Sequence, residues 1–68
     1  MTEVDARGLS CPIPVVETKK ALKAHPEGVR VIVDANVCKE NVSRYAFAMG
    51  YKLKVKEKTG EWTMEITR

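Results

Sequence analysis

Cys11-Pro12-Ile13-Pro14 places two prolines one residue apart, directly after a cysteine. Proline has a fixed φ and no N–H group, so a helix tolerates it only in its first turn. Because residues 15–24 contain neither glycine nor proline, the two prolines predict the start of a helix. The residue before a proline is displaced from the α region. The stretch therefore predicts Cys11 as the N-cap, Pro12 as the first helical residue and Pro14 as the third.

A cysteine at this position is expected to be reactive. An N-cap side chain accepts a hydrogen bond from the second or third helical N–H group, and since the third residue is a proline, the Ile13 N–H group is the remaining donor. The positive end of the helix dipole favours an anion, and reactive cysteines cluster at helix starts. Arg7 adds a second positive charge four residues upstream. We expect Cys11 to be an accessible thiolate, the alternative being a small buried residue.

Hydrophobic periodicity divides the rest of the chain into strands and helices. Residues 2–5 and 29–34 are predicted strands, and residues 12–24 form the first helix. Asn36 is the predicted N-cap of a second helix that Gly50 ends. Two alternating runs, 51–56 and 62–67, flank Thr59-Gly60 and predict a hairpin.

The same periodicity predicts the buried face of each element. Helical spacing and strand alternation give the following core positions: Val15, Thr18, Ala21, Leu22 and Ala24; Val29, Val31 and Val33; Cys38, Val42, Tyr45, Ala46 and Met49; Tyr51, Leu53, Val55, Trp62, Met64 and Ile66. Phe47 lies opposite the stripe of the second helix and is expected to be exposed.

The predicted fold is an α/β two-layer sandwich with the order β-α-β-α-β-β, in which two helices cover one face of a mixed four-stranded sheet. Right-handed crossovers between parallel strands place both helix N-termini at the same end of the sheet. Cys11 and Cys38 are therefore expected at one edge. The residues alone leave the strand order open.

Length and composition favour a small carrier or binding module. The 68 residues predict one domain, 1–68, with too little room for the enclosed active site of a self-contained enzyme. Two cysteines, with no signal-like N-terminus and no membrane-length apolar run, indicate a cytoplasmic protein. Two cysteines and His25 are too few soft ligands for a structural zinc site. We expect no metal and no cofactor.

Several stretches carry a family resemblance. Residues 5–14, DARGLSCPIP, followed by Lys19-Lys20-Ala21-Leu22, resemble the signature of the TusA/SirA-like sulfur-carrier family. Val33-Asp34, Lys39-Glu40-Asn41-Val42 and Gly50-Tyr51 resemble in particular the YedF-like branch, which is associated with selenium and sulfur metabolism. The resemblance covers essentially the whole chain. It implies the strand order 1-2-4-3 with an antiparallel fourth strand.

The resemblance also implies a function, that of a sulfur carrier with sulfurtransferase-type chemistry. A donor, such as a cysteine desulfurase or a rhodanese-like protein, would load Cys11 with sulfane sulfur, and the persulfide would pass its outer sulfur to an acceptor protein. Both steps depend on a nucleophilic, accessible thiolate. The implied site-shaping residues are Asp5, Arg7, Gly8, Pro12 and Pro14. The pathway stays open among tRNA thiolation, cofactor assembly, thiosulfate use and selenium handling, as does the oligomeric state.

Two other functions are considered. An RNA-binding or regulatory module would use the lysines at 52, 54 and 56, but Tyr51 and Trp62 fall on the buried side of the hairpin, so direct nucleic-acid binding is not favoured. A thiol redox protein would use Cys38 as an accessory thiol for Cys11, whereas the plainer interpretation of Cys38 is a packed core residue. His25 is expected at the far end of the first helix, which leaves Cys11 without a Cys–His pair.

Overall fold

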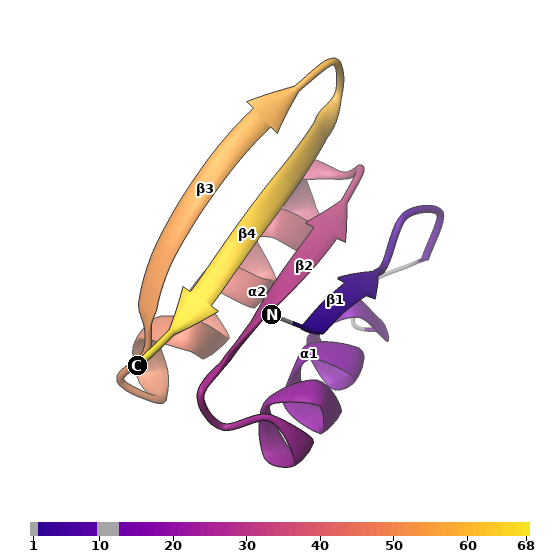
Figure 1. The fold of residues 1–68 in the computed structure, drawn as a ribbon. Helices are drawn as coiled ribbons and strands as arrows, with labels where there is room; N and C mark the ends of the chain where they lie inside the picture. The colour runs from indigo at the N-terminus through magenta and orange to yellow at the C-terminus, as the bar shows by residue number, and fades with distance from the viewer. Residues whose placement is uncertain (1, 10–12) are drawn as a thin grey trace.

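Two helices cover one face of a four-stranded sheet (Figure 1). The structure is a computed structural model that describes residues 2–9 and 13–68. Its elements are β1 (Thr2–Asp5), α1 (Ile13–Ala24), β2 (Gly28–Val33), α2 (Asn36–Ala48), β3 (Lys52–Lys58) and β4 (Glu61–Thr67). This confirms the predicted two-layer α/β fold and its element order. The predicted N-cap Cys11 and first helical residue Pro12 lie outside the described residues.

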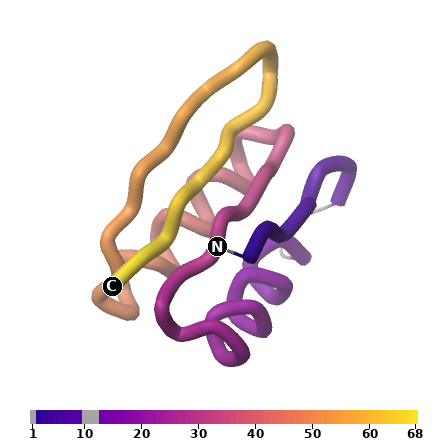
Figure 2. The backbone as a smooth tube through the Cα atoms, in the orientation of Figure 1, coloured from indigo at the N-terminus to yellow at the C-terminus, as the bar shows by residue number. Residues whose placement is uncertain are grey.

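The sheet has the order β1-β2-β4-β3, which is the order that the family resemblance implied. β1 pairs with β2 in parallel, and β4 is antiparallel to both of its neighbours. The two helices follow β1 and β2 in the chain and lie side by side against the sheet (Figure 2). Because β1 and β2 point the same way, α1 and α2 both begin near the same end of the sheet, as predicted.

The core lies between the sheet and the helices. The three valines of β2, at 29, 31 and 33, are fully buried, and Met64 and Ile66 of β4 lie beside them. α1 buries Leu22 and also Thr18, whose hydroxyl donates a 2.8 Å hydrogen bond to the Pro14 carbonyl oxygen. That bond satisfies the polar atom, so a threonine is tolerated on a core-facing stripe.

The start of α2 differs from the prediction. Ala35, not Asn36, is the N-cap, with extended φ and ψ of −131° and 134°, and no side chain caps the helix. The Lys39 N–H group donates to the Ala35 carbonyl oxygen at 3.0 Å, which is the first helical bond. Asn36 is therefore the first helical residue, and its side-chain amide instead lies 3.5 Å from Glu40. At the other end Gly50 ends the helix as predicted.

The end of α2 forms a Schellman motif. The Gly50 N–H group donates to the Phe47 carbonyl oxygen at 3.1 Å, and the Tyr51 N–H group to the Ala46 carbonyl oxygen at 2.9 Å. Gly50 has a φ of +80°, which glycine adopts without a steric penalty. The motif turns the chain from α2 into β3.

Three residues predicted to lie in the core are exposed. Ala24 is the last residue of α1 and is exposed. Val55 is 41% exposed because β3 is an edge strand and the outer part of the hairpin extends beyond the helices (Figure 1). Met49 is 57% exposed at the C-cap of α2. Phe47, at 66% exposure, was correctly predicted.

Candidate functional site

The candidate site lies around the loop that joins β1 to α1. Cys11 and Pro12 lie outside the described residues, so the site is built from the residues on either side of them in the chain. Asp5 ends β1, while Arg7 and Gly8 lie in the loop. Pro14 is in the first turn of α1, where it is buried and its carbonyl oxygen accepts the Thr18 hydroxyl.

The Arg7 side chain ties the loop to two carboxylates. Its Nε and Nη2 atoms each donate to an oxygen of Asp5 at 2.9 Å, and its Nη1 atom donates to Glu61 at 3.3 Å. The hydrogen bonds from Arg7 lower the pKa of Asp5 to about 2, and the two carboxylates raise the pKa of Arg7. Arg7 thus connects the loop to the start of β4, and two opposite charges accompany its positive charge.

A second attachment comes from Asp34, the residue after β2. Both of its carboxylate oxygens accept the Gly8 N–H group, at 3.0 and 3.1 Å. Gly8 has a φ of +76°, while a Cβ atom there would meet nothing within 4 Å. Glycine is therefore favoured by its backbone conformation and not by crowding. The loop is consequently held from both sides, by Asp34 and by the Arg7 cluster (Asp5, Arg7 and Glu61).

Sequence reasoning did not assign Asp34 to the site, although it noted that Asp34 closes a strand. The relevant signal was topological, because the loops that follow neighbouring parallel strands meet at one edge of the sheet. β1 and β2 form such a pair, and the Ala6 N–H group extends their pairing by donating to the Ile32 carbonyl oxygen at 2.8 Å. This pairing brings Gly8 and Asp34 together.

Cys38 lies in the first turn of α2 and is 3% exposed. Its sulfur is 3.7 Å from the carbonyl oxygen of Leu9, the last described residue before α1. The start of α2 therefore contacts the loop that leads to Cys11, as the predicted topology required. Cys38 packs in the core, and its accessory role as a thiol stays a prediction.

Exposed apolar side chains mark the beginnings of both helices. Ile13 and Val16 of α1 are 45% and 44% exposed, and Val37 in the first turn of α2 is 59% exposed. Residues three apart on a helix are neighbours, so Ile13 and Val16 form one small apolar surface. We call these three residues the apolar rim.

The described residues near the loop do not include His25, the one histidine of the chain. His25 follows the last residue of α1, at the opposite end from Ile13, and its Nδ1 atom lies 3.5 Å from Glu27. Within residues 2–9 and 13–68, no three or more histidine, cysteine or acidic side chains are grouped so that they could hold a metal ion. None of the helices in the described part of the chain is long and apolar enough to cross a membrane.

Comparison with known proteins supplies the family. Residues 2–68 match the family described as "Sulfurtransferase TusA". A protein of Methanocaldococcus jannaschii named "Putative sulfur carrier protein MJ0990" is 39% identical over 61 residues, covering 87% of this chain and 81% of that protein. A Thermotoga maritima protein with a similar name is 34% identical over 67 residues, covering 93% of this chain and 85% of its own.

The fold agrees with the sequence match. The crystal structure of a SirA-like protein from Desulfitobacterium hafniense superposes with a TM-score of 0.91 at 38% identity. The match covers 98% of this chain and 96% of the other. Sequence and structure therefore agree over nearly the full length, and the chain belongs to the TusA family.

Proposed function

We propose that this protein is a sulfur carrier that accepts sulfane sulfur as a persulfide on Cys11 and relays it to an acceptor protein. Its family membership over residues 2–68 is the observation that carries the proposal. The relatives named as sulfur carriers support the same role. The catalytic group is the Cys11 thiolate, and no metal or cofactor is needed for either transfer step.

Each transfer exchanges one S–S bond for another. The Cys11 thiolate attacks the outer sulfur of a persulfide on the donor, the new S–S bond forms, and the donor cysteine leaves as a thiolate. In the second step a thiolate of the acceptor attacks the outer sulfur on Cys11, which leaves as a thiolate in turn. Each step converts one persulfide and one thiolate into another persulfide and another thiolate. Because there is no net oxidation or reduction, no external oxidant or reductant takes part.

In this proposal the residues around Cys11 fix the shape of the loop that precedes it. Asp34 and the Arg7 cluster hold the loop on two sides, which limits the positions that the following residues can reach. Pro14 lies in the first turn of α1, and the dipole of this helix favours an anion at its start. Since Asp5 and Glu61 accompany Arg7, its contribution is the shape of the loop more than a free positive charge.

The partners would bind at the apolar rim. A cysteine desulfurase or a rhodanese-like protein is the proposed donor, because either presents a persulfide at an active site into which a small protein can dock. Both partners must reach the same cysteine, so they bind in turn. We place the protein in the cytoplasm, where thiols stay reduced. The pathways that such a carrier would serve are tRNA thiolation, cofactor assembly, thiosulfate use and selenium handling.

The RNA-binding alternative gains no support from the position of the aromatic residues. Tyr51 is 9% exposed, and Trp62 is half-buried with the Lys39 ammonium 5.6 Å from its ring centre. Stacking of bases needs aromatic rings on an open surface. The lysines of β3 therefore lack a stacking partner on their own face within the described residues.

Intact-mass measurement tests the proposal. The reduced protein is incubated with a cysteine desulfurase and cysteine, beside the variants Cys11→Ser and Cys38→Ser. We expect a gain of one sulfur atom that a reductant reverses, absent in Cys11→Ser and retained in Cys38→Ser. Loss in both variants would favour the thiol redox alternative, which needs both cysteines. A wild-type protein that is alkylated at Cys11 but gains no sulfur from either kind of donor would refute the carrier.

A further inference from the structure

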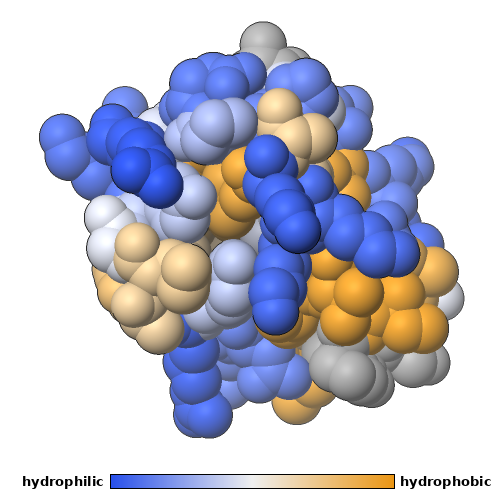
Figure 3. Space-filling model, turned by 90° about the horizontal axis from the view of Figure 1, so that it is seen from below, coloured by the Kyte–Doolittle hydropathy of each residue, from blue (hydrophilic) through white to orange (hydrophobic). Residues whose placement is uncertain are grey.

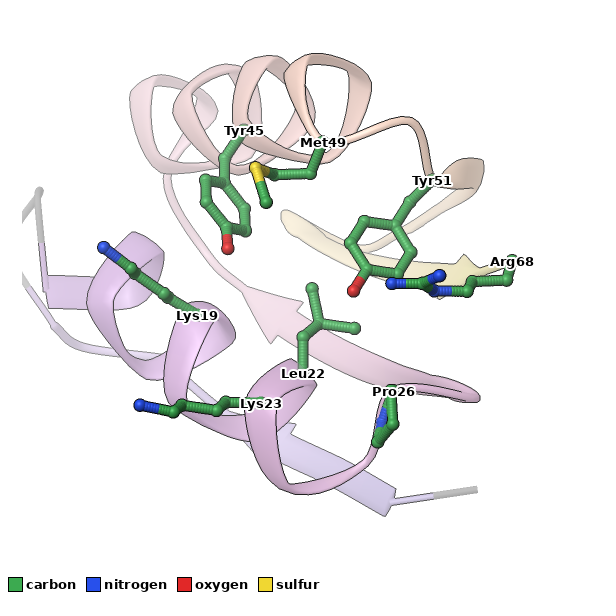
Figure 4. Close-up of a pocket in the computed structure, with 8 residues that line it drawn as sticks. All are labelled: Lys19, Leu22, Lys23, Pro26, Tyr45, Met49, Tyr51 and Arg68. Atoms are coloured by element: carbon green, nitrogen blue, oxygen red, sulfur yellow. The ribbon is translucent and has the colours of Figure 1, made fainter.

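A groove of about 310 Å³ lies between the C-terminal halves of α1 and α2, close to the start of β3 and the end of the chain (Figure 4). It is at the opposite end of the helices from the apolar rim. Figure 3 views this end of the molecule and shows hydrophilic side chains projecting between two areas of apolar surface. The sulfur-carrier chemistry proposed above makes no use of it.

The charged residues that line the groove are all cations. Lys19 and Lys23 lie one helical turn apart on α1 and extend to the same side, and Arg68 lies on the other side of the groove (Figure 4). No aspartate or glutamate is among the described lining residues. Among the ion pairs within 4.0 Å in the described part of the chain, α1 uses Lys20, which pairs with Glu17, and neither groove lysine. The side chains that line the groove therefore carry a net positive charge, with no acidic partner within 4.0 Å among the described residues.

The cations of the sheet are different. Arg30 pairs with Glu65 at 2.9 Å and with Glu3 at 3.7 Å. Hydrogen bonding to Arg30 lowers the pKa of Glu65, and the charges of Lys54 and Lys56 add to this effect. Arg30, Lys54 and Lys56 of the sheet thus have an acidic neighbour within the protein. In the groove, positive charge and exposed apolar surface lie together.

The floor of the groove is apolar. Leu22 and Tyr51 are 3% and 9% exposed, and Met49 projects into the space from α2 with 57% of its surface exposed (Figure 4). A methionine adapts its shape to irregular apolar partners. Arg68 lies over the Tyr51 ring, 5.2 Å from its centre, so its guanidinium is held at the edge of the groove. An apolar side chain would fit between two cationic edges.

We propose that this groove binds an acidic segment of a partner protein, in which an apolar side chain lies between two carboxylates. The apolar side chain would contact Leu22 and Met49, while the carboxylates would pair with the lysines of α1 and with Arg68. The volume is at the lower end of the range for small-molecule sites, roughly 300–1,000 Å³. The groove is also open, because Lys19, Lys23 and Met49 are exposed, so it suits a side chain of a docked segment better than an enclosed ligand.

The proposal does not depend on the sulfur chemistry. The groove and the apolar rim lie at opposite ends of the same two helices, so a segment bound in the groove leaves the helix starts accessible. A partner held in this way would keep the protein nearby while its other end exchanges between proteins. Such a tether raises the effective concentration without adding contacts at the site.

Titration of the ¹⁵N-labelled protein with short peptides tests the proposal. The main probe alternates glutamate with leucine, and two control peptides replace either glutamate by glutamine or leucine by serine. We expect amide shifts at residues 19–23 and 45–51 with the main probe, and weaker binding of both controls. Absence of these shifts at millimolar peptide, or equal binding of the serine control, would overturn the proposal.

Two matched double variants test the role of charge. Lys19→Gln with Lys23→Gln removes two charges from the groove, and Lys54→Gln with Lys56→Gln removes two from β3. Because exposed ion pairs are individually weak, we expect about a fivefold loss of affinity in the groove variant and less than about twofold in the β3 variant. Equal losses of affinity in the two variants would show that the peptide responds to net charge alone. That result would refute the groove as the binding site.

Two other kinds of anionic ligand are tested by the same NMR titration. A single-stranded RNA oligonucleotide and vesicles of phosphatidylcholine with phosphatidylglycerol are titrated under identical conditions. We expect neither to perturb residues 19–23 and 45–51 as strongly as the acidic peptide. Stronger perturbation of the groove by RNA or by vesicles would overturn the assignment to a protein segment. Met49→Gln provides the last control, since it should weaken the leucine peptide and leave the serine peptide unchanged.

Discussion

Removing the carboxylate of Asp34 tests whether the loop before Cys11 is held as described. In Asp34→Ala the Gly8 N–H group loses two acceptor oxygens at 3.0 and 3.1 Å. A hydrogen bond to a charged group contributes about 1.5–3 kcal/mol, and partial exposure reduces this, so we expect a loss of about 1 kcal/mol. For a domain of this size that loss lowers the Tm by roughly 4–8 °C. Thermal unfolding followed by circular dichroism measures the change.

A second measurement separates positioning from stability. The rate of alkylation of Cys11 by iodoacetamide is compared between the wild-type protein and Asp34→Ala, both carrying Cys38→Ser so that one thiol reacts. The sequence predicts Cys11 at the helix start, where a thiolate is favoured, and a loosened loop would keep it there for less of the time. We therefore expect slower alkylation in Asp34→Ala, measured well under the transition temperature. Unchanged alkylation with a lowered Tm would refute the positioning role of Asp34.

Two conservative variants control for charge. Asp34→Asn keeps an oxygen that can accept the Gly8 N–H group, so we expect about half of the effect on Tm. Glu57→Gln removes one negative charge from exposed β3. The Glu57 side chain makes no hydrogen bond within the described residues, so we expect a Tm close to that of the wild type. A Tm for Asp34→Ala within about 1 °C of the wild type would show that the bond to Gly8 contributes nothing in solution.

Three further predictions concern the fold and the Arg7 cluster. In a carboxyl titration by NMR, Asp5 should titrate near pH 2 in the wild type and closer to 3.8 in Arg7→Gln, so the stability it provides is present above its unfolded pKa and is lost as pH falls through about 2. An unchanged titration would contradict the Arg7 contact. Leu22→Ala should cost about 2–5 kcal/mol in urea unfolding, because the side chain is buried. Gly50→Ala should cost about 1–2 kcal/mol from its φ of +80°, since no atom lies within 4 Å of the added carbon; a neutral effect would mean that the helix end rearranges.

Local rules predicted the elements of this fold well. The alternation of apolar residues in the hairpin and the helix-ending role of Gly50 follow from backbone geometry, so the sequence was sufficient to predict them. The strand order needed the family resemblance, because β4 could pair with β2 or with the outside of β3 without changing any local pattern. The structure places β4 between them.

The three mistaken predictions of burial share a cause. Periodicity tells which side of an element a residue faces, but it does not tell whether another element covers that side. Met49 and Val55 lie on the predicted side of their elements, but neither is covered there. Met49 follows the last residue of α2, and Val55 is in β3, an edge strand. The misplaced N-cap has a different origin. Asn36 is a good capping residue, but it is the first helical residue, and Ala35, with extended φ and ψ, is the N-cap.

The part of the site that could not be predicted from the sequence consists of contacts between residues far apart in the chain. Arg7 meets Glu61 across 54 positions of sequence, and no pattern near Arg7 indicates this partner. The sequence predicted a positive charge beside Cys11, whereas the structure pairs that charge with two carboxylates. The expected effect of Arg7 therefore shifts from electrostatics to the shape of the loop.

The two ends of the helical layer differ in how they would recognise a partner. At the helix starts the apolar rim is exposed and Arg7 is neutralised by its neighbours, so contact there depends on shape and apolar area. At the helix ends Lys19, Lys23 and Arg68 are in no ion pair within the described residues, so binding there depends on charge, which salt screens within about 10 Å at 0.1 M. Raising the salt concentration should therefore weaken a partner held at the groove much more than one docked at the rim. A carrier built in this way can change its partner at one end while the other end stays bound.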